Sequence, residues 1–278
     1  MTFSRLAVGL DGSPHSESAL SHALRLARSA RSLVRGIHVV DRSLLDGVVV
    51  ADLSGSVGFQ PFLNLSGELR EALVSAGGAI LAAFEARAKE AGVEFELVLE
   101  EGNVSEILEE QAQSCGLAAI GSRGANAAHR RDLVGRHADA LARRMPTSLL
   151  VAPSDYRDFR QPVLAWDGSP KSRRALALAA ELAALLDLSI RIVTATDDED
   201  EGQALLAQAE EELRYRRVRA TGVVRKSHPD DAIFEEVGAG GDLVAMGAHG
   251  HGRVVELVLG STTDRVLRAA TVPVLLAG

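Results

Sequence analysis

Short runs of apolar residues alternate along the chain with longer segments in which apolar residues recur at helical spacing. In the first half, the runs predict strands at residues 6–10, 33–40, 93–100, 117–120 and 148–152. The segments between them predict helices at 16–30, 66–91, 104–114 and 136–144. Such runs, rich in β-branched residues, suit strands buried on both faces, so the alternation predicts a parallel sheet covered by helices on each side.

The second half repeats this pattern, with strands predicted at residues 163–166, 189–194, 218–225, 243–246 and 272–276. Three landmarks recur in the same order. Asp-Gly-Ser-Pro follows the first strand of each half, in "RLAVGLDGSP" and "QPVLAWDGSP". A pair of glycines follows the fourth strand, in "LAAIGSRG" and "LVAMGAHG". The halves end with "TSLLVAP" and "TVPVLLAG". An internal repeat of this kind predicts two homologous domains, at residues 1–154 and 160–278.

The halves differ most between their second and third strands. That stretch is about 30 residues longer in the first half, beyond the usual length of a connection. It includes the Gly- and Ser-rich "DGVVVADLSGSVGFQPFLNLSG". A long excursion over residues 41–66 is compatible with a lid, a partner surface or disorder, and the sequence leaves the three open.

The candidate site lies where strand order reverses, because open parallel sheets bind ligands beyond the carboxyl ends of their strands. Asp167 closes the first strand of the second half and Gly247 closes the fourth. Gly247 and Gly250 would let the backbone approach a ligand or adopt positive φ. Gly260-Ser261-Thr262 would open the next helix, whose free amides favour an anion. The alternative is an ordinary cap, with Ser261 as N-cap and Asp264 completing a capping box.

Composition narrows the class of protein. The 278 residues suffice for one large or two ordinary domains, and the hydrophobic 46% occurs in short runs, without a transmembrane span. The net charge of −8 argues against a nucleic-acid partner, and a membrane partner is not expected. A single cysteine, Cys115, together with the lack of a signal-peptide pattern, leads us to expect a cytoplasmic protein.

The pattern Gly247-x-x-Gly250, nine residues, then Gly260-Ser261 resembles the ATP-binding signature of universal stress proteins. The strand ending in Asp-Gly-Ser is similar to that family's opening strand, and the resemblance covers essentially the whole chain as two tandem domains. It implies a five-stranded parallel sheet in each domain, of the adenine nucleotide alpha hydrolase-like class, with ATP, with or without Mg²⁺, held between the first and fourth strands.

Carried over to this sequence, the resemblance gives a cofactor-binding set in the second domain. Asp167 would face the adenine or ribose, Thr194 would border adenine, and the glycines with Ser261 and Thr262 would hold the phosphates. Trp166 packs in the core or narrows the entrance. The full set is Ala165, Trp166, Asp167, Thr194, Gly247, His249, Gly250, Gly260, Ser261 and Thr262.

The first domain departs from this pattern. After Gly121 and Gly124, ten residues precede Gly135, and Arg136 stands where the pattern has Ser or Thr. We therefore expect a degenerate site at Asp11, Gly121, Gly124 and Gly135. Four arginines could still attract an anion, or could form a solvated basic loop, namely Arg123, Arg130, Arg131 and Arg136.

Other features favour ordinary roles. His249 and His251 form an incomplete metal site, so no metal is expected. The acidic run at 197–201 suits the start of a helix. Nothing beside Cys115 marks a low-pKa thiol.

No Walker motif occurs, so catalytic residues are not assigned and at most a slow ATPase is expected. Two hypotheses remain: an ATP-binding, nucleotide-responsive regulatory or stress-survival protein with one site, or a scaffold that acts without nucleotide. In both, the last strands of the two halves pair as an intramolecular pseudo-dimer, as the resemblance implies. Further assembly into a homodimer stays open.

Overall fold

The computed structural model describes residues 2–43, 65–124, 135–248 and 259–278. Most of the excursion at 41–66 therefore lies outside the described residues, as do Arg130, Arg131, His249, Gly250 and His251. Within the described ranges, no helix is both long and apolar enough to cross a bilayer.

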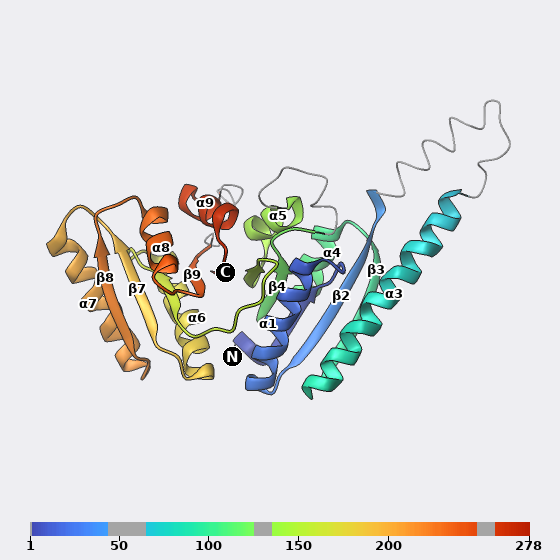
Figure 1. Ribbon diagram of the computed structural model, residues 1–278, viewed down its shortest axis with the longest axis horizontal. Coiled ribbons are helices and arrows are strands. Elements are labelled where there is room, and N and C mark those ends of the chain that lie inside the picture. Colours follow the sequence, from blue (N-terminus) through green and yellow to red (C-terminus); the bar gives the residue numbers. More distant parts are fainter. Residues whose placement is uncertain (1, 44–64, 125–134, 249–258) are drawn as a thin grey trace, which may run out of the picture.

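The first half alternates strand and helix as predicted (Figure 1). After a short 3-10 turn at Thr2–Ser4, its elements are β1 (Arg5–Gly9), α1 (Pro14–Ala30), β2 (Leu33–Asp41), α3 (Leu65–Ala91), β3 (Phe95–Gly102), α4 (Val104–Ala112), β4 (Leu117–Gly121), α5 (Arg136–Arg144) and β5 (Ser148–Ala152).

The second half repeats the order. Its elements are β6 (Pro162–Ala165), α6 (Pro170–Leu186), β7 (Ile190–Ala195), α7 (Glu199–Tyr215), β8 (Ala220–Arg225), α8 (Pro229–Gly238), β9 (Leu243–Gly247), α9 (Ser261–Ala269) and β10 (Val274–Ala277). The predicted strands are all present, with ends that shift by no more than two residues.

The described strands form one ten-stranded sheet in the order β3-β2-β1-β4-β5-β10-β9-β6-β7-β8. Neighbours within each half are parallel, whereas β5 and β10 pair antiparallel across the two halves, with Leu150 opposite Leu275. The predicted pseudo-dimer is therefore confirmed. Each half covers the edge that the other would expose, so two five-stranded sheets become one.

Helices cover both faces of this sheet. Apolar residues of α1, α3, α6 and α7 form one core with it, including Leu20, Phe84 and Leu176. Residues of α4, α5, α8 and α9 form the core on the other face, including Leu141, Ile233 and Val266. This doubly wound arrangement confirms the predicted fold class and leaves the carboxyl ends of the strands as the place for a ligand.

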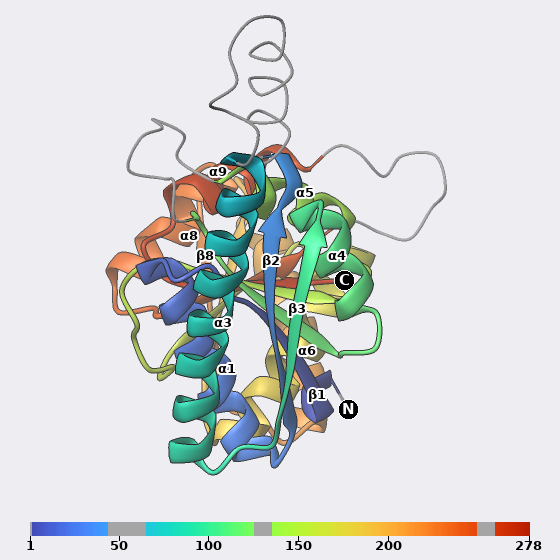
Figure 2. The same cartoon turned by 90° about the vertical axis from the view of Figure 1, so that its right-hand side faces the viewer.

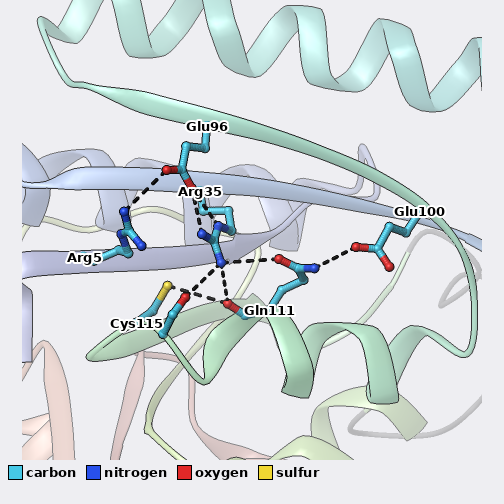
Figure 3. A network of polar contacts seen from close by, with 7 residues as sticks. Arg5, Arg35, Glu96, Glu100, Gln111 and Cys115 are labelled. Atoms are coloured by element: carbon cyan, nitrogen blue, oxygen red, sulfur yellow. Dashed lines mark hydrogen bonds and ion pairs between the residues drawn. The ribbon is translucent and has the colours of Figure 1, made fainter.

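A polar network holds α4 against β2 and β3 (Figure 3). The guanidinium of Arg35 donates to Glu96 at 2.8 Å and to the backbone carbonyl of Gln111 at 3.0 Å. Arg191 holds the equivalent place in the second half, where it donates to Glu236 at 3.2 Å. Each domain thus fixes the helix after its third strand with one arginine from its second strand.

The connection between the halves is packed rather than loose. Phe159 is buried and stacks on the imidazole of His22, with ring centroids 4.7 Å apart. His22 is itself fully buried, and burial lowers its pKa to about 4. Among the described residues, neither ring nitrogen of His22 has a hydrogen-bond partner. The residues that join the domains therefore rest on an uncharged histidine of α1.

Candidate functional site

The turn after β6 presents Asp167. Its carboxylate accepts a hydrogen bond from the backbone N–H of Ser169 at 3.0 Å, and Gly168 makes the turn possible with φ of 72°. Ser169 then caps α6 by accepting from the N–H of Ser172 at 3.2 Å, and Pro170 occupies the first turn, where it loses no helical bond. Partial burial alone would raise the pKa of Asp167, but hydrogen bonds from Ser169 and Ser172 hold it below its usual value.

Thr194 supports this turn from the neighbouring strand. It is buried, and its hydroxyl donates to the Trp166 carbonyl at 3.0 Å. Trp166 is buried too, and its indole N–H donates to the Leu205 carbonyl of α7 at 2.8 Å. Of the two interpretations of Trp166, the structure therefore favours packing in the core, and it shows that Thr194 holds the strand end in place.

Of the two roles suggested for Gly247, positive φ is wrong, whereas close approach to a ligand stays a prediction, and the structure adds a packing role. Its φ is not positive, and a Cβ there would lie 2.6 Å from the Cβ and 2.7 Å from the backbone carbonyl carbon of Lys171. Gly121 is in the same position against His15 in the first domain. The glycine at the end of the fourth strand therefore lets the first helix of the domain pack closely.

The start of α9 excludes the simple cap interpretation. The N-cap is Gly260, and it makes no side-chain capping bond. Ser261 is the first helical residue, while the Asp264 carboxylate accepts from Arg268 at 2.8 Å instead of completing a capping box. A Cβ on Gly260 would find its nearest atom 3.9 Å away, so the space before this helix is open.

These elements enclose a pocket of about 240 Å³ at the carboxyl ends of β6 and β9. Of the predicted set, the residues on its wall are Ala165, Trp166, Asp167, Gly247, Gly260 and Thr262. Thr194 and Ser261 are not on the wall as described, and His249 and Gly250 lie outside the described residues.

Sequence reasoning missed four polar residues on this wall: Ser169, Lys171, Ser172 and Thr263. Lys171 is the most informative, since it places a cation beside Asp167. The signal was present in "DGSPKS", because the first turn of a helix that follows a strand faces the same edge of the sheet as the strand end.

The helix α8 forms the far wall with Pro229, Ala232 and Ile233. Asp230 is fully buried beneath this wall and pairs with Arg265 of α9 at 2.8 Å. This ion pair fixes the start of α9 relative to α8. In the first domain Ser105 of α4 takes the equivalent place, with its hydroxyl 3.0 Å from Nδ1 of His137 of α5.

A second pocket, of about 780 Å³, occupies the same place in the first domain. The four residues of the expected degenerate site all line it: Asp11, Gly121, Gly124 and Gly135. Arg136 at the start of α5 donates to the Asp41 carboxylate at 2.9 Å and to the Ser43 hydroxyl at 3.3 Å. Arg136 is therefore held by an ion pair instead of being simply solvated. A phosphate would have to compete with Asp41 for its guanidinium.

The expectation that no metal binds stays a prediction, because His249 and His251 lie outside the described residues. The described residues contain no group of three or more side chains suited to a metal ion. The acidic run opens α7, where Asp198 accepts from the N–H groups of Asp200 and Glu201. Cys115 is buried, and burial raises its pKa.

Comparison with known proteins agrees with this architecture. A family model described as "Universal stress protein family" matches residues 2–153 and again 159–278. A universal stress protein of Synechocystis sp. is 30% identical over 95% of this chain and 96% of its own length.

Among solved structures, a universal stress protein from Archaeoglobus fulgidus covers 100% of this chain and 99% of its own, with a TM-score of 0.77 at 17% identity. A universal stress protein in complex with cAMP covers 44% of this chain and 98% of its own, with a TM-score of 0.39 at 25% identity.

Proposed function

The chain belongs to the universal stress protein family, and on that premise we propose that its second domain binds one ATP and that the bound nucleotide regulates the protein's contacts with partners. The observation that carries the proposal is the open start of α9 at the pocket. Among the described residues, no side chain caps the first-turn amides after Gly260, and the atom nearest to a Cβ on Gly260 would be 3.9 Å away. Such a helix start binds phosphate through its N–H groups and its dipole.

The charges around the pocket suit a nucleotide. Lys171 lies on the wall and adds a cation to the positive end of α9. Asp167 is anionic at neutral pH, since its pKa is lowered, and a carboxylate at this place can accept hydrogen bonds from ribose hydroxyls. Thr262 brings a hydroxyl to the phosphate side.

The inner wall is apolar and suits the flat face of a base. It is formed by Val193, Ala195, Ile233 and Met246. The pocket volume of about 240 Å³ is below the ~300–1,000 Å³ typical of pockets that enclose a whole ligand. The base and ribose would fill it, and the triphosphate would extend outward over the start of α9.

Binding without rapid turnover follows from the groups present. Phosphoryl transfer needs a metal clamp, a positioned nucleophile and charge stabilisation. The described wall offers one carboxylate, Asp167, and one lysine, Lys171. Regulation has a structural route, because Asp264 of α9 lies 3.7 Å from Arg143 of α5, so a shift of α9 on binding would reach the first domain.

The test is mass spectrometry of the nucleotide released from purified protein that has received no added nucleotide. We expect about one ATP per chain, and a loss of at least about ten-fold in affinity in a Gly260→Val, Ser261→Ala variant, because the valine side chain would occupy the space before α9 that the phosphates need. The matched control is Gly135→Val, Arg136→Ala in the first domain, which should keep its ATP.

Two ATP molecules per chain would contradict the assignment of a single site. Failure to release nucleotide, together with failure to bind ATP or cAMP in calorimetric titration, would reject the proposal and leave the scaffold hypothesis as the better one.

A further inference from the structure

The first-domain pocket is more than a remnant of the second. Its volume is about 780 Å³ against about 240 Å³ for its counterpart, within the range of pockets that enclose small molecules. Its additional wall comes from α3, through Leu73, Ala76 and Ile80. In the second domain, α7 contributes no residue to the described wall.

The length of α3 accounts for part of this difference. It has 27 residues against 17 in α7, which makes it about 15 Å longer. The extra turns lie at its N-terminal end, which reaches the carboxyl end of β2 (Figure 2). Leu73 lies in this extra part and extends the apolar wall beyond the end of the sheet.

The two helices can be matched residue by residue where they overlap. Val93 donates to the Ala88 carbonyl after α3, as Val218 does to Leu213 after α7. This match places Ile80 opposite Leu205. A Cβ on Gly12 would meet Ile80 first, just as a Cβ on Gly168 would meet Leu205.

In the same match, Ala76 corresponds to Glu201. The larger Glu201 closes this side of the pocket in the second domain, and the smaller Ala76 leaves it open in the first. In the second domain, Glu201 accepts from the Thr196 hydroxyl at 3.1 Å, across the end of β7. The indole of Trp166 fills the neighbouring space against α7, where the first domain has the smaller Leu10. Ala76 and Leu10 leave this side of the first-domain pocket open.

The polar end of the pocket carries Asp11 and Arg123 as well as Asp41 and Arg136, so a triphosphate would face two carboxylates there. Partial burial would raise the pKa of Asp41, but hydrogen bonds from Ser43 and the charge of Arg136 hold it below its usual value, so Asp41 is anionic. Its carboxylate neutralises Arg136 at the start of α5 and lies 4.0 Å from His137. Burial lowers the pKa of His137, which is therefore neutral at pH 7. The anion-binding end of the helix already faces a carboxylate of the protein.

We infer that the first-domain pocket binds an uncharged, mainly apolar small molecule and excludes nucleoside triphosphates. The body of this ligand lies between α3 and the end of β2, against Leu73, Ile80 and Ile37. The two domains therefore bind different ligands in equivalent places. This inference is independent of whether the second domain binds ATP.

The test uses N-phenyl-1-naphthylamine, a neutral apolar dye whose fluorescence rises when water is excluded from it. We expect one saturable site per chain in the wild-type protein. Ala76→Glu puts the second domain's residue on the pocket wall, and a charge there should weaken dye binding by at least about ten-fold. Position 76 is exposed on a helix and glutamate is a good helix former, so the variant should fold.

The matched control is Ala79→Glu, an exposed position of α3 that is not on the described pocket wall, which should bind the dye like the wild type. ATP at saturating concentration should not displace the dye, and the Gly260→Val, Ser261→Ala variant should keep the site. Equal binding by Ala76→Glu, displacement by ATP, or lack of a saturable site would each overturn the inference.

Discussion

The two domains share a framework and differ at the mouths of their pockets. In the first, the Nδ1–H of His38 donates to the Leu10 carbonyl at 2.7 Å, and in the second the Thr194 hydroxyl makes the equivalent bond to Trp166. The strand ends are thus held alike by different side chains. The first residue of α5, however, is Arg136, which pairs with Asp41, whereas the first residue of α9 is the uncharged Ser261. A repeated fold can therefore keep its geometry while one residue changes the charges at the mouth of a pocket.

The two domains also differ in their first helices. A substitution there has the largest expected effect on the free energy of unfolding. His22 of α1 corresponds to Leu178 of α6, so His22→Leu makes the first domain resemble the second. With a folded pKa of about 4 against an unfolded value near 6.5, the unfolded state binds more protons between these values. The wild type therefore loses stability as pH falls from 6.5 through 4, by up to about 3 kcal/mol.

His22→Leu should remove most of this loss, as measured by urea denaturation at pH 7, 5.5 and 4. A variant that keeps the acid sensitivity of the wild type over this range would show that another group causes it.

The next largest effect on the free energy of unfolding tests whether the glycines at the ends of the two fourth strands have the same packing role. Gly247→Ala and Gly121→Ala would each put a Cβ within 2.7 Å of the first helix of its domain, whose backbone cannot easily move. Because the contacts are with α6 and α1, the first helices of the two domains, each substitution should lower the free energy of unfolding by about 2 kcal/mol, as overpacking does. Gly260→Ala meets its nearest atom at 3.9 Å and should cost less than about 0.5 kcal/mol. A similar cost for all three in chemical denaturation would contradict this distinction.

A smaller effect on stability concerns the contact that joins the last two helices of each domain, which is an ion pair in the second domain and a neutral contact in the first. Asp230→Ala removes the buried carboxylate that contacts both Arg265 and His228, but both partners are half exposed and can be hydrated, so we expect a loss of about 1 to 2 kcal/mol. Ser105→Ala removes only a neutral contact to His137 and should cost at most about 1 kcal/mol. If Ser105→Ala proved the more costly in guanidinium denaturation, the ion pair would not be what fixes α9.

The smallest effect concerns the contact between the domains. Arg143 lies 2.9 Å from Asp139 in its own helix and 3.7 Å from Asp264 of the other domain, and all three are partly exposed. A double-mutant cycle of Arg143→Gln and Asp264→Asn should give a coupling of about 0.5 kcal/mol that falls with added salt. Zero coupling at low salt would remove this route between the two pockets, and a coupling change on addition of ATP would establish it.

Much of the candidate site was predictable from the sequence, and the exceptions have a common cause. Asp167, Gly260 and Thr262 follow from the order of apolar runs and small residues, because a strand end and a helix start must meet at one edge of a parallel sheet. Lys171 and Thr263 were missed, since their importance depends on which face of a helix turns toward the pocket. Gly247 was found, but its close contact with α6 was not foreseen, because that contact depends on how a helix distant in sequence packs.

The sequence by itself determined the two domains and the order of their strands and helices, because these depend on local periodicity and on a repeat visible along the chain. The pairing of their last strands was an expectation from the family resemblance, and the structure confirms it. Only the tertiary structure decided the size and charge of the two pockets. Asp41 and Arg136 are distant in sequence and meet across the end of the sheet. Ala76 opens a pocket only because α3 lies against β2. Such contacts depend on packing between elements, and a pattern along one element does not contain them.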